Sequence, residues 1–323
     1  MPDTEGKTER GLKPLYKSGS GRMYCGKSEE VLQSFPVNLY KGKVQLVFTS
    51  PPFPLNRKKK YGNLQGQEYV NWVAEFAPML REFLTEDGSI VVELGNAWEP
   101  GNPTMSTLPL KALLAFQEKA GLHLCQEFIC FNTARLPTPA QWVNIERIRV
   151  KDAFTRVWWM SPTPKPKADN RKVLTEYSGS MRMLLKKGTY NAGRRPSEHQ
   201  IGETSFLKDN GGAIPPNVLV PALESMLPDI HEVLPIANTR SNDAYQLHCR
   251  ERGIEPHPAR MPIELVRFFV LLLTDERDWV LDPFAGSNTT GLVAEQLGRK
   301  WLTIEADVDY ARASASRFGL DLT

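Results

Sequence analysis

The chain has 323 residues, 41% of them hydrophobic and 24% charged, which is the composition of an ordinary globular protein. Its net charge of +3 favours a polyanionic partner only weakly, so the distribution of charge is more informative than the sum. The longest apolar run, Phe268 to Leu273, is six residues and cannot span a bilayer. Four cysteines without CxxC pairing and five scattered histidines predict reduced thiols and no metal site.

The first 160 residues predict a tail followed by alternating strands and helices. Residues 1–20 are polar and glycine-rich without an apolar segment, so we expect a flexible tail and a cytoplasmic protein. Alternation over 21–160 predicts a parallel sheet with helices on both faces. The expected strands are 22–25, 44–49, 89–94 and 128–132, and the expected helices are 68–84 and 108–119.

The periodicity fades between residues 161 and 255, where Pro, Gly and Lys are frequent and no single element is predicted. We expect a loop-rich lobe there, because apolar clusters recur within it. Residues 161–187 hold seven Lys and Arg against two acids, and Arg194 and Arg195 follow.

The last block, residues 256–323, predicts a helix over 262–274 and then a βαβ unit. The unit consists of a strand at 279–281, a helix at 291–297 and a strand at 301–305.

The small-residue loop DPFAGSNTTG (282–291) follows the first strand of that unit and leads into its helix, a common place for a ligand. Leu292 stands where a triphosphate loop has lysine, and Asn288 stands where a dinucleotide loop has glycine. A nucleoside-like ligand remains as a candidate. Glu305 lies 19 residues after Gly286, a spacing suited to binding the ribose hydroxyls of such a ligand. A plain packing turn is the alternative.

The strand at 44–49 stops abruptly at Ser50, Pro51, Pro52 and Phe53. The two prolines hold this corner extended and donate no N–H, so its carbonyls are available to accept from another group. Glu93, at the end of the next strand, is a candidate polar neighbour.

Together, SPPF (50–53) and DPFAGS (282–287) resemble the catalytic and cofactor motifs of amino-group DNA methyltransferases. The serine in the first motif is typical of enzymes that act on cytosine N4, and the motif order resembles the β class of restriction–modification systems. The resemblance implies an α/β, Rossmann-like mixed sheet with helices on both faces, permuted motifs and a smaller target-recognition lobe. It divides the chain into a tail (1–20), a catalytic half (21–160), a target-recognition region (161–255) and a cofactor half (256–323).

The resemblance also implies S-adenosyl-L-methionine as cofactor and the exocyclic amine of a flipped cytosine as target, with SPPF as the catalytic residues. The implied cofactor-binding residues are Lys27, Ser28, Arg260, Pro262, Asp282, Phe284, Gly286, Ser287, Asn288, Thr289 and Glu305. Two of them depart from the family. Lys27 replaces the usual carboxylate that pairs with the adenine amine, and Asn288 replaces a glycine.

Double-stranded DNA is the expected partner, since a buried base must be flipped to reach such a pocket. The basic run Arg57, Lys58, Lys59 and Lys60 directly follows SPPF and, with Arg194 and Arg195, is expected to contact DNA. The family context implies functional pairing with a restriction endonuclease without stable binding, a monomer, and association with the nucleoid only through DNA.

Three other functions stay open. Adenine N6 could be the target on the same scaffold, the chain could be a DNA-binding module without turnover, or it could hydrolyse a nucleotide. Cytosine C5 methylation is excluded, because no cysteine follows a proline.

Overall fold

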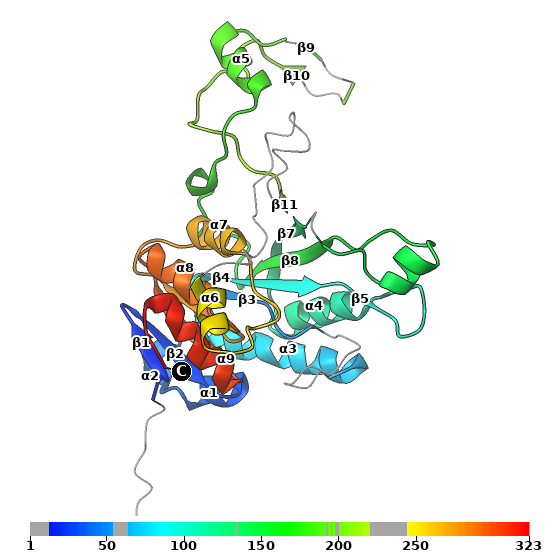
Figure 1. The fold of residues 1–323 in the computed structure, drawn as a ribbon. Helices are drawn as coiled ribbons and strands as arrows, with labels where there is room; N and C mark the ends of the chain where they lie inside the picture. Colours follow the sequence, from blue (N-terminus) through cyan, green and yellow to red (C-terminus); the bar gives the residue numbers. More distant parts are fainter. Residues whose placement is uncertain are drawn as a thin grey trace, which may run out of the picture.

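The computed structural model describes residues 13–53, 64–132, 135–191, 193–194, 196–197, 200–219 and 244–322 (Figure 1). Its centre is a nine-stranded mixed sheet in the order β1-β2-β13-β12-β3-β4-β8-β7-β11. The strands are β1 (Tyr16–Ser18), β2 (Gly21–Cys25), β3 (Val44–Thr49), β4 (Leu84–Gly95), β7 (His123–Phe131), β8 (Phe154–Ser161), β11 (Val218–Leu219), β12 (Trp279–Asp282) and β13 (Lys300–Glu305). Two small hairpins pair β5 (Ala97–Trp98) with β6 (Met105–Ser106) and β9 (Gly193–Arg194) with β10 (Gln200–Ile201).

Helices cover both faces of the sheet. The helices are α1 (Ser28–Ser34), α2 (Val37–Tyr40), α3 (Gly66–Phe83), α4 (Leu108–Lys119), α5 (Gly179–Lys187), α6 (Ala244–Glu251), α7 (Ile263–Leu273), α8 (Thr289–Gln296) and α9 (Val308–Ser314). Short η turns lie at Gln141–Ile145, Asn170–Val173 and Ala315–Phe318. No described helix is long and apolar enough to cross a membrane.

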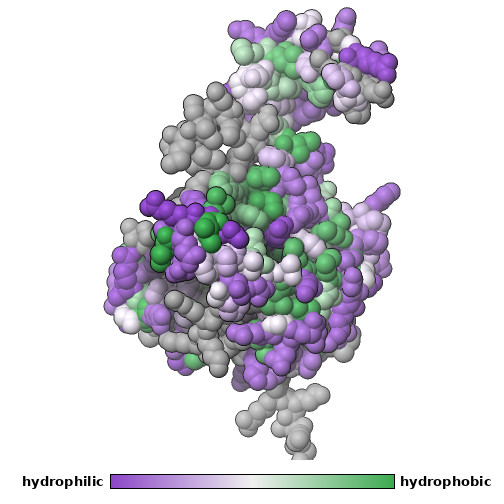
Figure 2. Space-filling view, turned by 90° about the vertical axis from the view of Figure 1, so that its right-hand side faces the viewer, coloured by the Kyte–Doolittle hydropathy of each residue, from purple (hydrophilic) through white to green (hydrophobic). Residues whose placement is uncertain are grey.

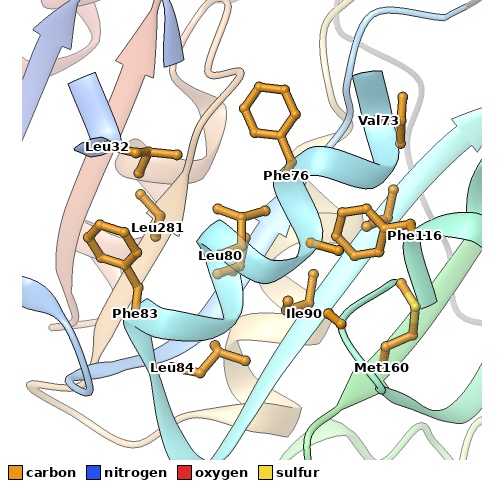
Figure 3. Close-up of a cluster of buried hydrophobic side chains, with 14 of the residues drawn as sticks. Leu32, Val73, Phe76, Leu80, Phe83, Leu84, Ile90, Phe116, Met160 and Leu281 are labelled. Carbon is orange, nitrogen blue, oxygen red and sulfur yellow. The ribbon is translucent and has the colours of Figure 1, made fainter. Parts of the chain in front are cut away.

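One face of the sheet packs against α1, α3 and α4 (Figure 3). Phe76, Leu80 and Phe83 recur along α3 at helical spacing and are at most 2% exposed. They meet Ile90 from β4 and Leu281 from β12 in one cluster. Burying each such side chain stabilises the fold by roughly 1.5–3 kcal/mol, so the helical period seen in the sequence is the period of this contact.

The opposite face packs against α7 and α8 in a second cluster. The apolar helix α7 inserts Phe269 against Phe48 of β3, with ring centroids 5.6 Å apart. Trp301 of β13 is fully buried and stacks on Phe318, with ring centroids 4.9 Å apart. A strand buried on both faces is mostly apolar, which explains the run of β3, whose only polar residues are Gln45 and Thr49.

The sheet topology brings β3 and β12 side by side, although they are more than 200 residues apart in sequence. The two strands are parallel, so both end at the same edge of the sheet. Ligands of open α/β sheets bind beyond such carboxyl ends. Ser50 and the loop after Asp282 therefore emerge as neighbours.

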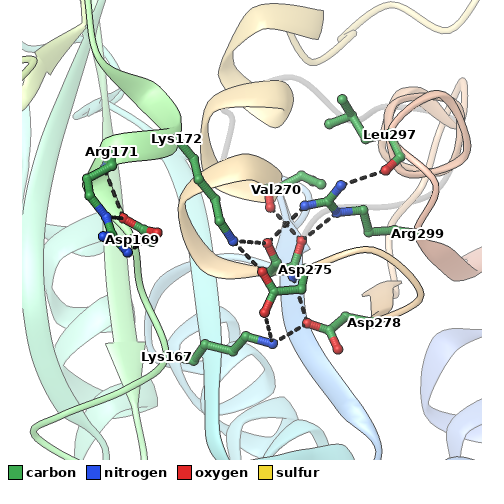
Figure 4. Close-up of polar contacts among 10 residues, drawn as sticks. Lys167, Asp169, Arg171, Lys172, Val270, Asp275, Asp278, Leu297 and Arg299 are labelled. Atoms are coloured by element: carbon green, nitrogen blue, oxygen red, sulfur yellow. Dashed lines mark hydrogen bonds and ion pairs between the residues drawn. The ribbon is translucent and has the colours of Figure 1, made fainter. Parts of the chain in front are cut away.

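An arm, residues 174–217, leaves the body between two anchored segments (Figures 1 and 2). Its root, residues 167–173, is fixed on the body by Asp169, whose N–H donates to the Leu272 carbonyl at 2.8 Å. Lys167 Nζ lies 2.7 Å from carboxylate oxygens of both Asp275 and Asp278, and Lys172 also pairs with Asp275 (Figure 4). At its far end, β11 pairs with β7.

The arm itself is held together sparsely. At its neck, the backbones of Thr175 and Ala213 exchange two hydrogen bonds, each 2.9 Å long. Gly212 lies against this crossing, where an added Cβ would be 2.6 Å from the Thr175 carbonyl oxygen. Beyond the neck, α5 is capped by the Ser178 side chain and by left-handed Gly188 and buries no residue.

The structure confirms the α/β fold and most predicted elements; β3 and α4 have the expected bounds. Three expectations need correction. Residues 16–18 of the expected tail form the edge strand β1, with Tyr16 buried against Trp301. The simple parallel sheet is interrupted by β8, which is antiparallel to β4 and β7. The helix expected from 291 begins at Thr289, because Asn288 caps it.

Candidate active site

A cavity of about 690 Å³ opens at the carboxyl edge of the sheet. Ser50–Phe53 line one part of it, and residues 282–287, 289 and 290 line another. Glu93, Asn132 and Thr155, from the ends of β4 and β7 and the start of β8, add polar groups beside Ser50. The two sequence motifs therefore share one cavity.

Asp282 ties the two motifs together at the floor of this cavity. Its Oδ1 accepts from the Thr49 hydroxyl at 2.9 Å and from the Phe284 N–H at 3.0 Å, and its Oδ2 accepts from the Thr290 hydroxyl at 2.6 Å. Desolvation by burial raises the pKa of Asp282 to about 6 despite these bonds. The residue before Ser50 and the cofactor loop are thus held by one carboxylate.

The Ser50 hydroxyl donates a hydrogen bond to the Glu93 carboxylate. Thr155 Oγ1 donates to the same carboxylate, reaching Oε1 at 2.9 Å. Burial raises the pKa of Glu93, while the two hydroxyls and the nearby charge of Arg135 oppose that rise. Because the Ser50 hydroxyl points its proton toward the Glu93 carboxylate, the lone pairs of the Ser50 oxygen stay available to accept a hydrogen bond from another group.

Phe53 lies at the mouth of this corner, against the end of β4. An added Cβ on Gly95 would be 2.5 Å from the Phe53 ring, so only glycine leaves room for the ring there. The ring is partly buried and packs at the edge of the main core.

The glycine loop turns at Gly286, whose φ of +52° lies in the left-handed region. The Gly286 N–H donates to Glu305 Oε2 at 2.7 Å, and the Asp307 N–H donates to Glu305 Oε1 at 2.9 Å. The His257 ring covers the loop, since a Cβ on Gly286 would be 2.9 Å from it. Burial raises the pKa of Glu305.

Asn288 is placed differently from expectation. It adopts the left-handed conformation with φ 54°, is fully buried, and is not part of the cavity wall. Its Oδ1 accepts from the Gly291 N–H at 3.0 Å, and its Nδ2 donates to the Tyr16 hydroxyl at 2.9 Å. Asn288 therefore caps α8 and connects it to β1 through Tyr16.

The other expected cofactor residues line the cavity. Ser28 is buried and its hydroxyl donates to the Pro283 carbonyl. Lys27 stands at the edge, with its side chain 73% exposed and paired to Glu30 at 3.3 Å. The remaining expected residues in the wall are Arg260, Pro262, Phe284, Ser287 and Thr289.

The expected DNA contacts are only partly described. The run Arg57, Lys58, Lys59 and Lys60 and Arg195 lie outside the described residues. Arg194 is exposed in β9 of the arm. Within the described ranges, no group of three or more His, Cys, Asp or Glu side chains is arranged to hold a metal ion.

Sequence reasoning missed several groups of this site. His257, Trp72 and Glu29 all line the cavity. The Trp72 indole N–H donates to Glu29 Oε1 at 2.7 Å, and the Trp72 ring lies 5.6 Å from that of Phe284. Trp72 occupies an ordinary apolar position of a helical pattern, so nothing in the sequence indicated its second role.

A family model described as DNA methylase matches residues 44–316. The chain belongs to the DNA methylase family. The methylase is 45% identical over 310 residues to the type II methyltransferase M.PvuII of Proteus hauseri, covering 95% of this chain and 86% of that one.

Solved structures agree with this assignment. The structure of the PvuII DNA methyltransferase (cytosine-N4-specific) matches the methylase with a TM-score of 0.73 and 40% identity, covering 97% of this chain and 91% of that one. The complex of M1.HpyAVI with SAM shares the fold at a TM-score of 0.51 and 18% identity, covering 93% of this chain and 100% of that one.

Proposed function

We propose that this DNA methylase transfers a methyl group from S-adenosyl-L-methionine to the N4 amine of a cytosine flipped out of duplex DNA. The observation that carries the proposal is the shared cavity, in which Thr49, the residue before Ser50, and the Gly286 loop are joined through Asp282. The M.PvuII relatives, 45% and 40% identical, support cytosine N4 as the target.

The residues present fit S-adenosyl-L-methionine. A left-handed glycine turn beside an acidic residue at the end of the next strand suits an adenosyl ribose, and Gly286 and Glu305 have this arrangement. Phe284 offers an aromatic surface in the same wall. When bound, the cofactor supplies an electrophilic methyl group on a sulfonium centre.

Ser50 and Pro51 orient the nucleophile in this proposal. The lone pair of the cytosine amine is delocalised into the ring, so acceptors for both amino hydrogens favour a pyramidal nitrogen that can attack. The Ser50 oxygen is suited to be one acceptor because its own proton is engaged by Glu93. The Pro51 carbonyl supplies the other, Pro52 stiffens the corner, and Phe53 stacks on the base. Fixed acceptors of this kind lower the barrier by preorganisation.

Duplex DNA is bound by two basic regions of the sequence. Flipping a base costs a few kcal/mol of unstacking, which phosphate contacts help to offset. The target-recognition role falls to the region 161–255, whose sequence carries Arg182, Lys186 and Lys187 in α5 and, further along the chain, Arg194 and Arg195. The run Arg57–Lys60 after SPPF contacts the backbone near the flipped base.

The biological role follows from this chemistry. Methylation protects DNA from a cognate restriction endonuclease that the methylase does not stably bind, and the enzyme acts as a monomer in the cytoplasm, near the nucleoid. One active site suffices for a palindrome that already carries methyl on one strand.

Transfer of tritium from labelled S-adenosyl-L-methionine into plasmid DNA, followed by nucleoside analysis by mass, tests the proposal. We expect N4-methylcytosine. Recovery of N6-methyladenine would establish the adenine alternative instead, and DNA binding without any transfer would establish a non-catalytic module.

A further inference from the structure

Four carboxylates line the cavity, and three of them accept at least two hydrogen bonds each from the protein itself. Both oxygens of Asp282 and of Glu305 accept hydrogen bonds from their own surroundings. Glu93 accepts from two hydroxyls on the Ser50 side. The fourth carboxylate, Glu29, has a different environment.

Glu29 is fixed by a single hydrogen bond. Its Oε1 accepts from the Trp72 indole at 2.7 Å, and its Oε2 accepts nothing within the described part of the chain. The side chain is only half-buried. A carboxylate held by one oxygen is preorganised and presents the other oxygen to a ligand.

The surroundings of Glu29 are aromatic. The Trp72 ring lies 5.6 Å from Phe284 and 5.2 Å from Phe76, and Tyr69 is 6.1 Å from Trp72 on the other side. Flat apolar walls beside one charged acceptor suit a heteroaromatic ring that carries an exocyclic amine. Phe284 also connects this wall to the Gly286 loop, two residues further on.

We propose that Glu29 accepts the amino hydrogen of the cofactor's adenine, with the Trp72 indole holding the carboxylate in place. The proposal rests on S-adenosyl-L-methionine being the cofactor, as proposed above. The proposal also accounts for Lys27, which stands where the family has the carboxylate that pairs with the adenine amine. That side chain is exposed and paired to Glu30, so the acceptor for the purine is supplied two residues later in the chain.

The chemistry predicts discrimination between an amine and a carbonyl at this position. An adenine amine donates to Glu29, whereas the carbonyl oxygen of hypoxanthine would face the carboxylate as a second acceptor. A site built to bond one polar group rejects an analogue that leaves its own group unpaired. We expect the wild-type protein to bind S-adenosylhomocysteine about 100-fold more tightly than S-inosylhomocysteine.

Titration calorimetry of the full-length protein with these two compounds tests the assignment. In Glu29→Ala the preference should fall below about 5-fold, because the charged acceptor is gone. Glu30→Ala is the matched control: this neighbouring acid pairs with Lys27 at the surface, so the wild-type preference should persist.

A second variant keeps the test independent of folding. Glu29→Gln retains an acceptor for Trp72 and can turn an amide N–H toward the ligand, so its preference should shrink or reverse in favour of the inosyl compound. An unchanged preference in Glu29→Ala or Glu29→Gln, with S-adenosylhomocysteine still bound, would overturn this assignment alone. Absence of S-adenosylhomocysteine binding to the wild-type protein would overturn the proposed cofactor and the assignment with it.

Discussion

The cavity wall and the arm are built in opposite ways. At the cavity, Asp282 accepts three hydrogen bonds from two motifs, and Asp282, Thr49 and Thr290 are nearly inaccessible to solvent. In the arm, α5 buries no residue, and the neck depends on the two backbone bonds between Thr175 and Ala213. The region proposed to carry out the chemistry is therefore fixed by buried hydrogen bonds, whereas the region proposed to recognise DNA is fixed by few contacts.

This contrast has a physical reason. Methyl transfer requires near-attack geometry, where a displacement of about 1 Å can cost 100-fold in rate. A surface that closes on a duplex must adapt, and segments with few buried contacts open at low free-energy cost. The ion pairs of Lys167 and Lys172 lie at the boundary between the two, on the anchored root of the arm.

The largest effect is expected from Ser50→Ala at the rigid end. Loss of one preorganised hydrogen-bonding group should lower the methyl-transfer rate about 10²–10³-fold, as for other single groups of this kind. Cofactor affinity should change less than about 2-fold, since Ser50 lies on the other side of the cavity. Single-turnover kinetics measures the rate, with Ser34→Ala as a surface control. A rate within about 3-fold of wild type would contradict the role of Ser50.

Asp282 predicts an unusual pH dependence of stability. Its folded-state pKa of about 6 lies above that of an unfolded Asp, so the folded state binds this proton more tightly. The tighter proton binding contributes roughly 2–3 kcal/mol to the free energy of unfolding. This contribution is complete below about pH 4 and is lost as the pH rises through about 6. The Asp282→Asn variant has no carboxyl group at this position, so it should not lose this stability as the pH rises. Urea unfolding at several pH values should show that the stability of Asp282→Asn rises relative to that of the wild type between pH 4 and 7. The same pH dependence of stability in both proteins would refute the raised pKa of Asp282.

Gly212→Ala tests the neck of the arm. The new Cβ would lie 2.6 Å from the Thr175 carbonyl oxygen, so the crossing must open. We expect DNA affinity to fall about 10-fold, which corresponds to about 1.4 kcal/mol, with cofactor affinity unchanged. Gly179→Ala is the matched control, because a Cβ there meets nothing within 4 Å. Equal DNA affinity in both variants, measured by fluorescence anisotropy, would show that the neck does not position the arm.

The smallest effect is expected at Tyr69, whose hydroxyl is buried without a hydrogen-bond partner in the described structure. Tyr69→Phe should leave stability unchanged or raise it by about 1 kcal/mol, because an unsatisfied polar group is removed. Tyr16→Phe should instead cost about 1 kcal/mol, since its hydroxyl bonds both Ser314 and Asn288. Urea unfolding of both variants measures the difference, and a destabilised Tyr69→Phe would mean that this hydroxyl is satisfied.

Much of the rigid region could be predicted from sequence because its signals are local. The apolar run of β3, the helical spacing in α3 and the SPPF and DPFAGS motifs each lie within a few consecutive residues. Parallel pairing of adjacent strands then brings the two motifs together.

The rest depended on contacts between distant residues. Nothing around Asn288 indicates that its partner is Tyr16, 272 positions away. The strand β1 looked like tail because its order comes from pairing with β2 and from the contacts of Tyr16 with Asn288 and Trp301. Trp72 matched the core pattern of a helix, so its bond to Glu29 was invisible. The helix α5 of the arm buries no residue, so packing does not require apolar residues to recur at a regular spacing in the sequence of the arm.

A crystal structure of the methylase with duplex DNA and a non-reactive cofactor analogue tests the central claim most directly. The account predicts an extruded cytosine with its N4 about 2.6–3.2 Å from both the Ser50 hydroxyl oxygen and the Pro51 carbonyl oxygen. An extruded base whose amine faces away from Ser50, or a target that stays stacked in the duplex, would contradict it.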